Sequence, residues 1–271
     1  MKIVGIIPSR YASTRFPGKG LVDICGKPML WWVYHTVREV EGIDEVICAI
    51  DDDRSKEICE KYEMDYVMTS PDCPEHISRI WEVSQVIKAD YYMCINGDEP
   101  LISEECIRPI IPDSIVEAPY FGGAIRVLNN PAETIDSANI KVVVSDTGRC
   151  LYMSRTPVPY PKGTLLFDYN KYVGVECLNK SALDFFVKTP MGSLEKIEDI
   201  DHLRFLENGI DLHFSYVESE SISVDTKKDL EKVRLIMAER LSRAQKTGGG
   251  GYCKQHYLTV LHANTGKKVA A

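Results

Sequence analysis

The sequence lacks any apolar run long enough to cross a membrane, and it has no excess of basic residues. A membrane-spanning helix needs about 18 or more predominantly apolar residues, so an integral membrane protein is excluded. The formal net charge of −8 argues against nucleic acid as a general partner. Hydrophobic residues make up 44% of the chain, which is enough for a packed core and excludes general disorder.

Paired cysteines are also missing. The nine cysteines never form a CxxC motif and never pair with histidine at zinc-finger spacing. Several lie in apolar runs such as EVICAI (45–50), where cysteine behaves as a small hydrophobic residue. We therefore expect reduced thiols and a cytoplasmic location. The short apolar run near the N-terminus, residues 2–7, is expected to be a first buried strand and not a signal peptide.

Strand-length apolar runs alternate with helical patterns. Strands are expected at residues 2–7, 45–50, 91–95, 123–128, 140–144, 171–178 and 212–217, and helices at 29–40, 54–62, 77–89, 197–207 and 227–241. The early alternation predicts a parallel α/β sheet covered on both faces, and the strand-rich region from about residue 122 predicts an antiparallel extension. We expect one domain over residues 1–245 and a tail, residues 246–271, hinged by the flexible run KTGGGG.

The loop after the first expected strand, IPSRYASTRFPGK (7–19), is rich in cations and hydroxyl groups. Because ligands bind beyond the carboxyl ends of strands in open parallel sheets, this loop suits a polyphosphate. It matches neither GxxxxGK[ST] nor GxGxxG, so neither an ATPase nor a dehydrogenase is indicated. The alternative is a solvated basic turn.

Two acidic motifs follow later strands. INGDEPLI (95–102) brings Asp98 to the same sheet edge, where a carboxylate beside a polyphosphate is best explained by Mg²⁺. Glu99 is either a second ligand or the start of a turn, and the whole motif has an alternative as an ordinary turn. In ISVDTKKDL (222–230), two alternatives are open: Asp225 reaches the metal opposite Asp98, or either Asp225 or Thr226 caps the next helix, with Asp229 in the first turn of that helix.

Four segments together resemble one enzyme family. They are IPSRYASTRFPGKGLVDICGKPML, INGDEPLI, IKVVVSDTGRCLYMSRTPVPY and SVDTKKDLEKVR. In order and spacing they resemble the 3-deoxy-manno-octulosonate cytidylyltransferase (CMP-Kdo synthetase) family over about residues 1–238. The resemblance implies a three-layer α/β/α nucleotide-diphospho-sugar-transferase-like fold, mostly parallel with an antiparallel extension. It also implies Mg²⁺-dependent transfer of CMP from CTP to an acidic sugar, with release of pyrophosphate, by a homodimer that makes contact near residues 152–178.

The resemblance further implies roles for individual residues. Nucleotide binding is expected from Pro8, Arg10, Ser13, Arg15, Lys19 and Arg79. Asp98 and Asp225 match the family's Mg²⁺ pair, and Lys19, Arg15 and Asp98 are the expected catalytic groups. The acceptor is expected to meet Asn96, Arg155, Tyr172 and Glu198, with the guanidinium of Arg155 binding a carboxylate in bidentate fashion.

Three segments depart from the family pattern. Residues 75–79 read EHISR where the family has Ser-Gly-Thr-Asp-Arg, Asn96 replaces a Gln, and Tyr172 replaces a His. These changes leave two alternatives open. One is CMP transfer to a different acidic acceptor, such as an amino-Kdo, a nonulosonic-type acid or a phosphonate. The other is an inactive nucleotide-binding relative, against which the presence of both Asp98 and Asp225 argues.

Three further predictions concern polar residues near these motifs. His76 is expected to be an exposed residue at the start of a helix. The run Asp51, Asp52 and Asp53 is expected to cap a helix and not to bind metal. The acidic residues of SLEKIEDIDHLRFLENG (193–209) are expected on the wet face of one helix, with Glu198 the one to test as an acceptor contact.

Overall fold

The computed structural model describes residues 1–12, 16–164, 166–218 and 221–246. A nine-stranded sheet runs through this described part in the order β11-β7-β10-β6-β1-β4-β5, with β8 joining β10 and β9 joining β8. Its strands are β1 (Ile3–Ser9), β4 (Glu45–Ile50), β5 (Tyr66–Met68), β6 (Tyr91–Ile95), β7 (Phe121–Val127), β8 (Lys141–Val144), β9 (Cys150–Ser154), β10 (Asn170–Asn179) and β11 (His213–Tyr216). Two short strands, β2 (Asp23–Ile24) and β3 (Lys27–Pro28), form a separate hairpin.

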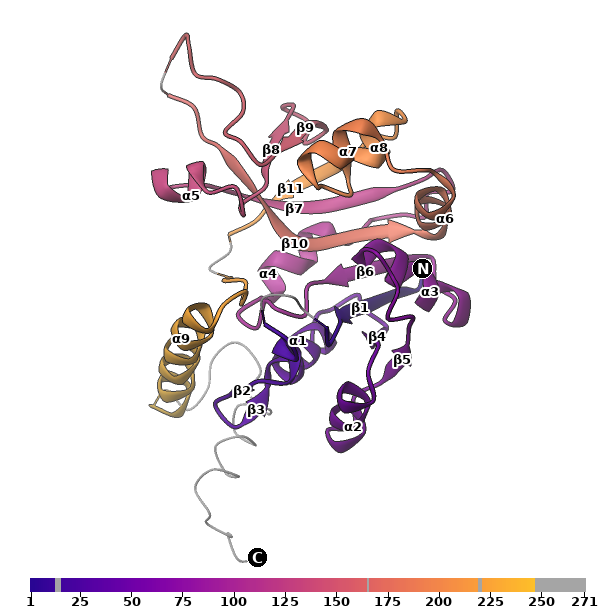
Figure 1. Cartoon of the computed structure of the whole chain (residues 1–271), viewed down its shortest axis with the longest axis vertical. Helices are drawn as coiled ribbons and strands as arrows, with labels where there is room; N and C mark the ends of the chain where they lie inside the picture. Colours follow the sequence, from indigo (N-terminus) through magenta and orange to yellow (C-terminus); the bar gives the residue numbers. More distant parts are fainter. Residues whose placement is uncertain (13–15, 165, 219–220, 247–271) are drawn as a thin grey trace, which may run out of the picture.

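Helices cover both faces of the sheet (Figure 1). They are α1 (Met29–Arg38), α2 (Asp53–Lys61), α3 (His76–Val86), α4 (Glu104–Ile107), α5 (Pro131–Ile135), α6 (Lys180–Lys188), α7 (Ser193–Glu198), α8 (Leu203–Glu207) and α9 (Lys227–Lys246), with 3₁₀ turns η1 (Lys19–Leu21) and η2 (Arg108–Ile110). Among the described residues no helix combines the length and the apolar composition needed to cross a membrane.

The two faces of β1 show why three layers form. Successive side chains of a strand point to opposite faces, so Ile3 and Ile7 join the core under α1 and α9. Val4 and Ile6 join the second core, under α3 and α6. Both cores exclude water, so the central strands are apolar along almost their whole length. The expected α/β/α fold is confirmed.

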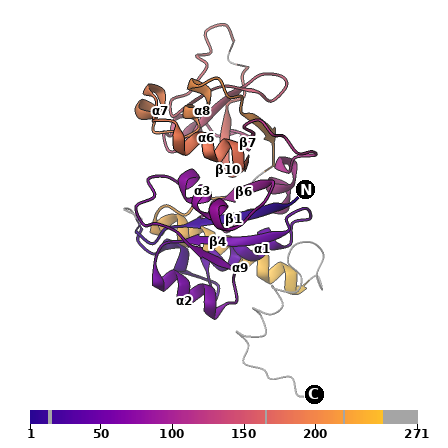
Figure 2. The ribbon, with the colours of Figure 1, turned by 90° about the vertical axis from the view of Figure 1, so that its right-hand side faces the viewer.

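The sheet has a parallel part and an antiparallel part. β1 pairs in parallel with β4 and β6, and β4 pairs in parallel with β5. β10 is antiparallel to β6 on one side and to β7 on the other, which confirms the expected antiparallel extension. Figure 2 shows the β10 and β7 part with α6, α7 and α8 stacked on the part that holds β1, β4, α1 and α2.

Several elements differ from the sequence-based expectation. The helix expected at 197–207 is two helices, α7 and α8, because Asp199 takes a left-handed conformation with φ of 53° between them. Helix α6 was not predicted because it follows β10 without a loop, and the side chain of Asn179 caps it by accepting from Ala182 N at 2.9 Å. The prediction for the tail after residue 246 lies outside the described residues, as does Cys253, while the cysteines of the described part carry free thiols.

Candidate functional site

The carboxyl ends of three neighbouring parallel strands meet at one edge of the sheet. Arg10 follows β1, Asp51 follows β4, and Asn96, Gly97 and Asp98 follow β6. The loop after β6 lies so close to β1 that a Cβ on Gly97 would be 2.8 Å from the carbonyl oxygen of Pro8. Only glycine fits this approach, and it holds the GDEP motif against the end of β1.

Lys19 lies between two carboxylates at this edge. Its Nζ pairs with Asp98 Oδ2 and lies 3.3 Å from Asp225 Oδ1. Asp225 reaches the site because Val224 N donates to the carbonyl oxygen of Asp98 at 2.9 Å, which ties the segment before α9 to the loop after β6. Residues 206 positions apart in the chain therefore share one ion-pair cluster.

The contacts of Asp225 and Glu99 bear on the alternatives left open for them. At the start of α9 the cap is Thr226, whose Oγ1 accepts from Asp229 N at 3.3 Å, while Asp229 Oδ2 accepts from Thr226 N at 2.8 Å in return. The carboxylate of Asp225 faces Lys19. Glu99 is buried, and its Oε1 accepts from Gly174 N at 3.3 Å. Burial raises the pKa of Glu99, as does the nearby charge of Asp98. Its contact with Gly174 N joins the loop after β6 to β10.

A pocket of about 410 Å³ opens at this edge. One side is formed by the strand ends and the loop after β1, and the other by the segment before α3 and the turn before α8. The predicted site residues that line it are Pro8, Arg10, Lys19, Arg79, Asn96, Asp98 and Asp225. Ser13 and Arg15 lie outside the described residues.

Arg79 is held firmly in the pocket wall. Its guanidinium donates to Thr69 Oγ1 and lies 3.0 Å from Asp51 Oδ2, and both members of this ion pair are almost fully buried. Asp52 caps α2 by accepting from Arg54 N at 2.9 Å, which confirms the predicted cap. Asp51 therefore has a different task from Asp52, because it fixes Arg79 and also accepts from Tyr11 N at 2.8 Å.

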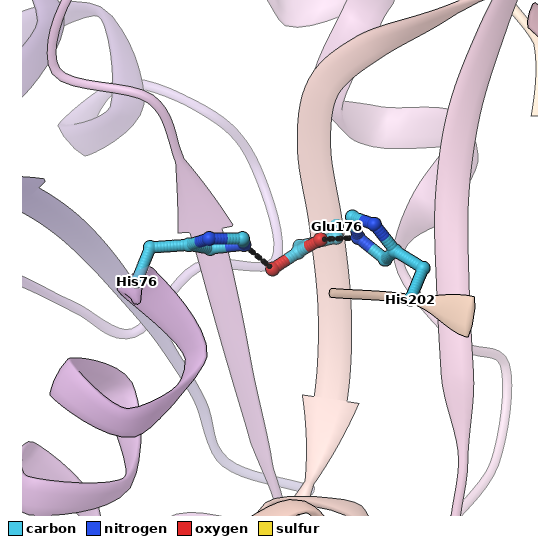
Figure 3. A group of neighbouring side chains, drawn as sticks. All are labelled: His76, Glu176 and His202. Carbon is cyan, nitrogen blue, oxygen red and sulfur yellow. Dashed lines mark hydrogen bonds and ion pairs between the residues drawn. The ribbon is translucent and has the colours of Figure 1, made fainter. Parts of the chain in front are cut away.

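A second cluster, unlike the first in composition, includes the pocket residue His76 (Figure 3). The carboxylate of Glu176 on β10 lies between two histidines, with His76 Nε2 2.8 Å from Oε1 and His202 Nε2 2.6 Å from Oε2. His76 Nδ1 lies 3.2 Å from Asp201 Oδ2, and Tyr172 Oη donates to Glu176 Oε2 at 2.9 Å. His76 is the first residue of α3, as expected, but the expected exposure was wrong, since its ring is only 28% exposed and belongs to this network.

The opposite charges of His76 and Glu176 shift the pKa of each group in the direction that favours its charged form. Burial alone would lower the pKa of His76, but the charge of Glu176 and hydrogen bonds with Asp201 and Glu176 outweigh it and raise that pKa well above its usual value. Burial alone would raise the pKa of Glu176, yet the two histidines lower it. Sequence reasoning missed Glu176 and His202. The available signal was a glutamate in the middle of the apolar strand YVGVECL (172–178).

Arg155 and Glu198 do not line the pocket formed by the described residues; they contact each other. Glu198 Oε2 accepts from Arg155 N at 2.9 Å, and Glu198 Oε1 accepts from Ser154 Oγ at 2.7 Å. The guanidinium of Arg155 donates to the carbonyl oxygens of Glu198 and Asp199, at 2.6 Å each, and of Ser137, at 3.2 Å. In this structure it fastens the end of β9 to the end of α7. Tyr172 likewise contacts Glu176 and does not line the pocket.

The acidic stretch 193–209 is also not a simple wet helix face. Glu195 is buried and receives two hydrogen bonds from Arg204, at 2.5 and 2.7 Å. Glu207 caps α7 by accepting from Leu194 N at 2.9 Å. These carboxylates therefore stabilise the fold of the α7–α8 region.

Comparison with known proteins identifies the family. Residues 4–221 match the cytidylyltransferase family model. The chain is 35% identical over 244 residues to the 3-deoxy-manno-octulosonate cytidylyltransferase of Acidobacterium capsulatum, with 89% of this chain and 98% of that protein covered. The chain belongs to the 3-deoxy-manno-octulosonate cytidylyltransferase family. The resemblance found in the four sequence segments is confirmed, and the protein is a cytidylyltransferase.

Other family members and solved structures agree with this assignment. The enzyme of the same name from Escherichia coli is 34% identical over 246 residues, covering 89% of this chain and 98% of that protein. A solved structure of CMP:2-keto-3-deoxy-manno-octonic acid synthetase complexed with CTP has a TM-score of 0.82 and 33% identity, covering 89% of this chain and all of that one. The 4-diphosphocytidyl-2C-methyl-D-erythritol synthase of Anaerococcus prevotii, at 16% identity and a TM-score of 0.59, covering 88% of this chain and 98% of that one, shows a shared fold.

Proposed function

We propose that this cytidylyltransferase transfers CMP from CTP to a hydroxyl group of an acidic sugar, Kdo or a Kdo-like acid, and releases pyrophosphate with the help of Mg²⁺. The observation that carries the proposal is the meeting of Lys19, Asp98 and Asp225 in one pocket at the carboxyl ends of β1 and β6. Ligands of open α/β sheets bind at this place. The family relatives named for the same transfer support the substrate.

The acidic residues of the pocket fit a hard divalent cation. Asp98 Oδ1 is buried and has no hydrogen-bond partner among the described residues, although a buried carboxylate oxygen is normally paired. Asp98 and Asp225 together would hold Mg²⁺, which prefers carboxylate and phosphate oxygens. When bound, it would neutralise phosphate charge and lower the pKa of the attacking hydroxyl group.

The chain's own cations would bind and orient the triphosphate. Lys19 is positioned by its two carboxylates, so its ammonium group is already in place before the nucleotide binds. Arg10 lines the same pocket from the exposed end of β1 and can reach a phosphate oxygen. Little further acid–base machinery is needed, because positioning and charge stabilisation dominate this kind of transfer.

A second candidate, CMP transfer to an acidic acceptor other than Kdo, is favoured by the position of Arg155. Its guanidinium is committed to three backbone carbonyl oxygens. The pocket is lined instead by Asn96 and by His76 and Asp201, which contact each other. Together with the replaced Tyr172, this lining supports an acceptor whose polar groups differ from those of Kdo.

Pyrophosphate release with a panel of acids tests both candidates. The protein is incubated with CTP, Mg²⁺ and, in separate reactions, Kdo, an amino-Kdo, a nonulosonic-type acid and a phosphonate. Release with Kdo as the best acceptor supports the first candidate, and release with another acid of the panel supports the second. Tight CTP binding without pyrophosphate from any acid would overturn both and leave a nucleotide-binding relative.

We also propose a homodimer with its contact near residues 152–178. Large apolar side chains in and beside this region are exposed, namely Leu151, Tyr160, Leu166 and Phe167. Exposed apolar patches of this kind mark protein interfaces. Sedimentation of the wild type as a dimer and of Leu166→Ser as a monomer supports this contact, and a monomeric wild type contradicts it.

A further inference from the structure

The cluster formed by His76, Glu176 and His202 is not explained by the proposed CMP transfer. Its residues come from three separate elements: the start of α3, the middle of β10 and the turn before α8. Their ligand atoms, two imidazole nitrogens and a carboxylate oxygen, all lie within 4.8 Å of one another. Figure 3 shows the carboxylate of Glu176 with one histidine ring at each end.

We propose that these three residues form a second metal site, for a borderline divalent ion such as Zn²⁺. Two imidazoles and one carboxylate are a ligand set found in zinc enzymes, and imidazole favours zinc and similar transition metals. The pair Asp98 and Asp225 offers only carboxylates, the ligands of hard cations. The two places therefore select different ions.

The contacts around the three residues are those that support metal ligands. Ligating histidines usually donate their second ring nitrogen to a carboxylate or a carbonyl group, which fixes the ring and its tautomer. His76 makes this contact, since Nδ1 lies 3.2 Å from Asp201 Oδ2 while Nε2 faces Glu176. Glu176 is oriented in the same way by Tyr172 Oη, which donates to Oε2 at 2.9 Å.

The third ligand presents its Nε2 to the same carboxylate. His202 is 3% exposed, and its Nδ1 is buried without a hydrogen-bond partner among the described residues. The ring packs against Phe121 and Tyr172, with centroids 5.1 and 5.0 Å away. The aromatic packing therefore fixes the ring, and its polar contact with Glu176 is made through Nε2.

The exposed fraction of the side chains increases from Glu176 to His76, which is the residue at the pocket. The side chain of Glu176 is fully buried and that of His202 is 4% exposed, whereas that of His76 is 28% exposed and lines the pocket. A metal held by these three residues would be open to a further ligand on the His76 side, because His76 is the member of the cluster that lines the pocket. Zinc sites with three protein ligands bind water or a substrate oxygen at a fourth position.

Zinc binding by the full chain tests the proposal without any measurement of activity. Protein stripped with a chelator is dialysed against Zn²⁺ in the absence of CTP, the bound metal is counted, and the dissociation constant is measured by competition with a chromophoric chelator. We expect one tightly bound Zn²⁺ per chain. Loss of an outer carboxylate typically weakens metal binding about 10–100-fold, so we expect that loss for Asp201→Asn and at least about 100-fold for His202→Gln and His76→Gln.

Two control variants separate this site from other places that could bind the ion. Asp98→Asn removes a carboxylate of the other candidate cation site. Cys253→Ser with His256→Gln removes a thiol and an imidazole that lie outside the described residues. Both should retain the tightly bound Zn²⁺.

Three results would overturn the proposal. One is a wild-type chain that retains no Zn²⁺, which would leave the cluster as a hydrogen-bonded His–Glu–His network. The second is zinc lost in either control variant, and the third is zinc kept in folded His202→Gln and His76→Gln. Circular dichroism shows whether each variant is folded. If a variant does not fold, zinc binding by the wild-type chain still tests the proposal. Because CTP and acceptor are absent, failure here is distinct from failure of the proposed CMP transfer.

Discussion

The proposed nucleotide side of the pocket, at the strand ends, and the proposed acceptor side, beside the cluster of His76, Glu176 and His202, are built in different ways. On the nucleotide side, Arg10, Asp51 and Asp98 each follow a parallel strand, and the side chains meet because neighbouring strands end at the same edge. On the acceptor side, Glu176 lies inside β10, just after an irregularity in its pairing with β7. Its partners come from the start of one helix and the turn before another.

The difference shows where a short motif is sufficient to place a side chain. A residue directly after a buried parallel strand is placed by that strand alone. A residue within an antiparallel strand is placed by the register, and a bulge changes where it points. The acceptor side therefore depends on contacts between distant segments, and stability measurements should reveal that dependence.

The largest effect is expected in the α7–α8 region of the acceptor side. Arg204→Met leaves the buried carboxylate of Glu195 without its partner, and breaking a buried ion pair in this way costs about 3–5 kcal/mol. The free energy of unfolding from urea denaturation measures the loss. The double variant Arg204→Met with Glu195→Leu should recover most of it, because it leaves no unpaired charge. A loss below about 1 kcal/mol for the single variant would contradict this assignment.

On the nucleotide side the large effect is expected on the rate and not on stability. Asp98→Asn should lower kcat for CMP transfer about 100- to 1,000-fold, because it removes a carboxylate that would hold the Mg²⁺ proposed to neutralise phosphate charge. Urea denaturation should show little change. Asp211→Asn, an exposed carboxylate 3.4 Å from Arg149, is the matched control and should keep full activity. Activity retained by Asp98→Asn would refute the role of this carboxylate.

A smaller effect is expected from the hydroxyl group of Tyr172. In metal-free protein, Tyr172→Phe removes one hydrogen bond to the buried charge of Glu176 and should lower the free energy of unfolding by about 1.5–3 kcal/mol. Tyr216→Phe is the control, because Tyr216 is 57% exposed and its hydroxyl accepts from Asn170 Nδ2. If both variants lose the same free energy of unfolding, the hydrogen bond from Tyr172 to Glu176 contributes no more than an exposed one.

The smallest effect is expected from the cap of α2. Asp52→Ala removes the acceptor for Arg54 N and should cost about 1 kcal/mol of stability. Asp52→Asn keeps an acceptor at the cap position and should cost much less. Thermal denaturation of both variants checks this, and an Asn variant as unstable as the Ala variant would show that the charge, not the cap, is responsible.

Sequence patterns predicted most of the parallel part of the molecule. β4 and β6 have the predicted bounds, and Asp52 caps α2 as expected. The resemblance to the family implied that Asp98 and Asp225 form a pair, and the structure brings both to Lys19. These predictions depended on short-range rules, namely where a buried strand ends and which residue precedes a helix.

The same rules failed where a polar residue has a buried partner from another segment. Glu195 and Asp201 have the spacing of a solvent-exposed helix face. In the structure, however, Glu195 pairs with Arg204, and Asp201 contacts His76. The resemblance gave no sign that the guanidinium of Arg155 donates to backbone carbonyl oxygens at the end of α7. The sequence pattern does not indicate which carboxylate pairs with which cation. Arg204 and Glu195 are 9 positions apart in the chain, and His76 and Glu176 are 100 positions apart.

By itself, the sequence determined the three-layer fold, the edge at which the pocket opens and the carboxylates and lysine of its nucleotide side. Local periodicity and strand ends carry that information, because each depends on a few neighbouring residues. Only the tertiary structure decided which groups Arg155 contacts and brought His76, Glu176 and His202 together. A buried charge must find its partner wherever the packing of distant segments places one, and that packing exists only in the folded chain.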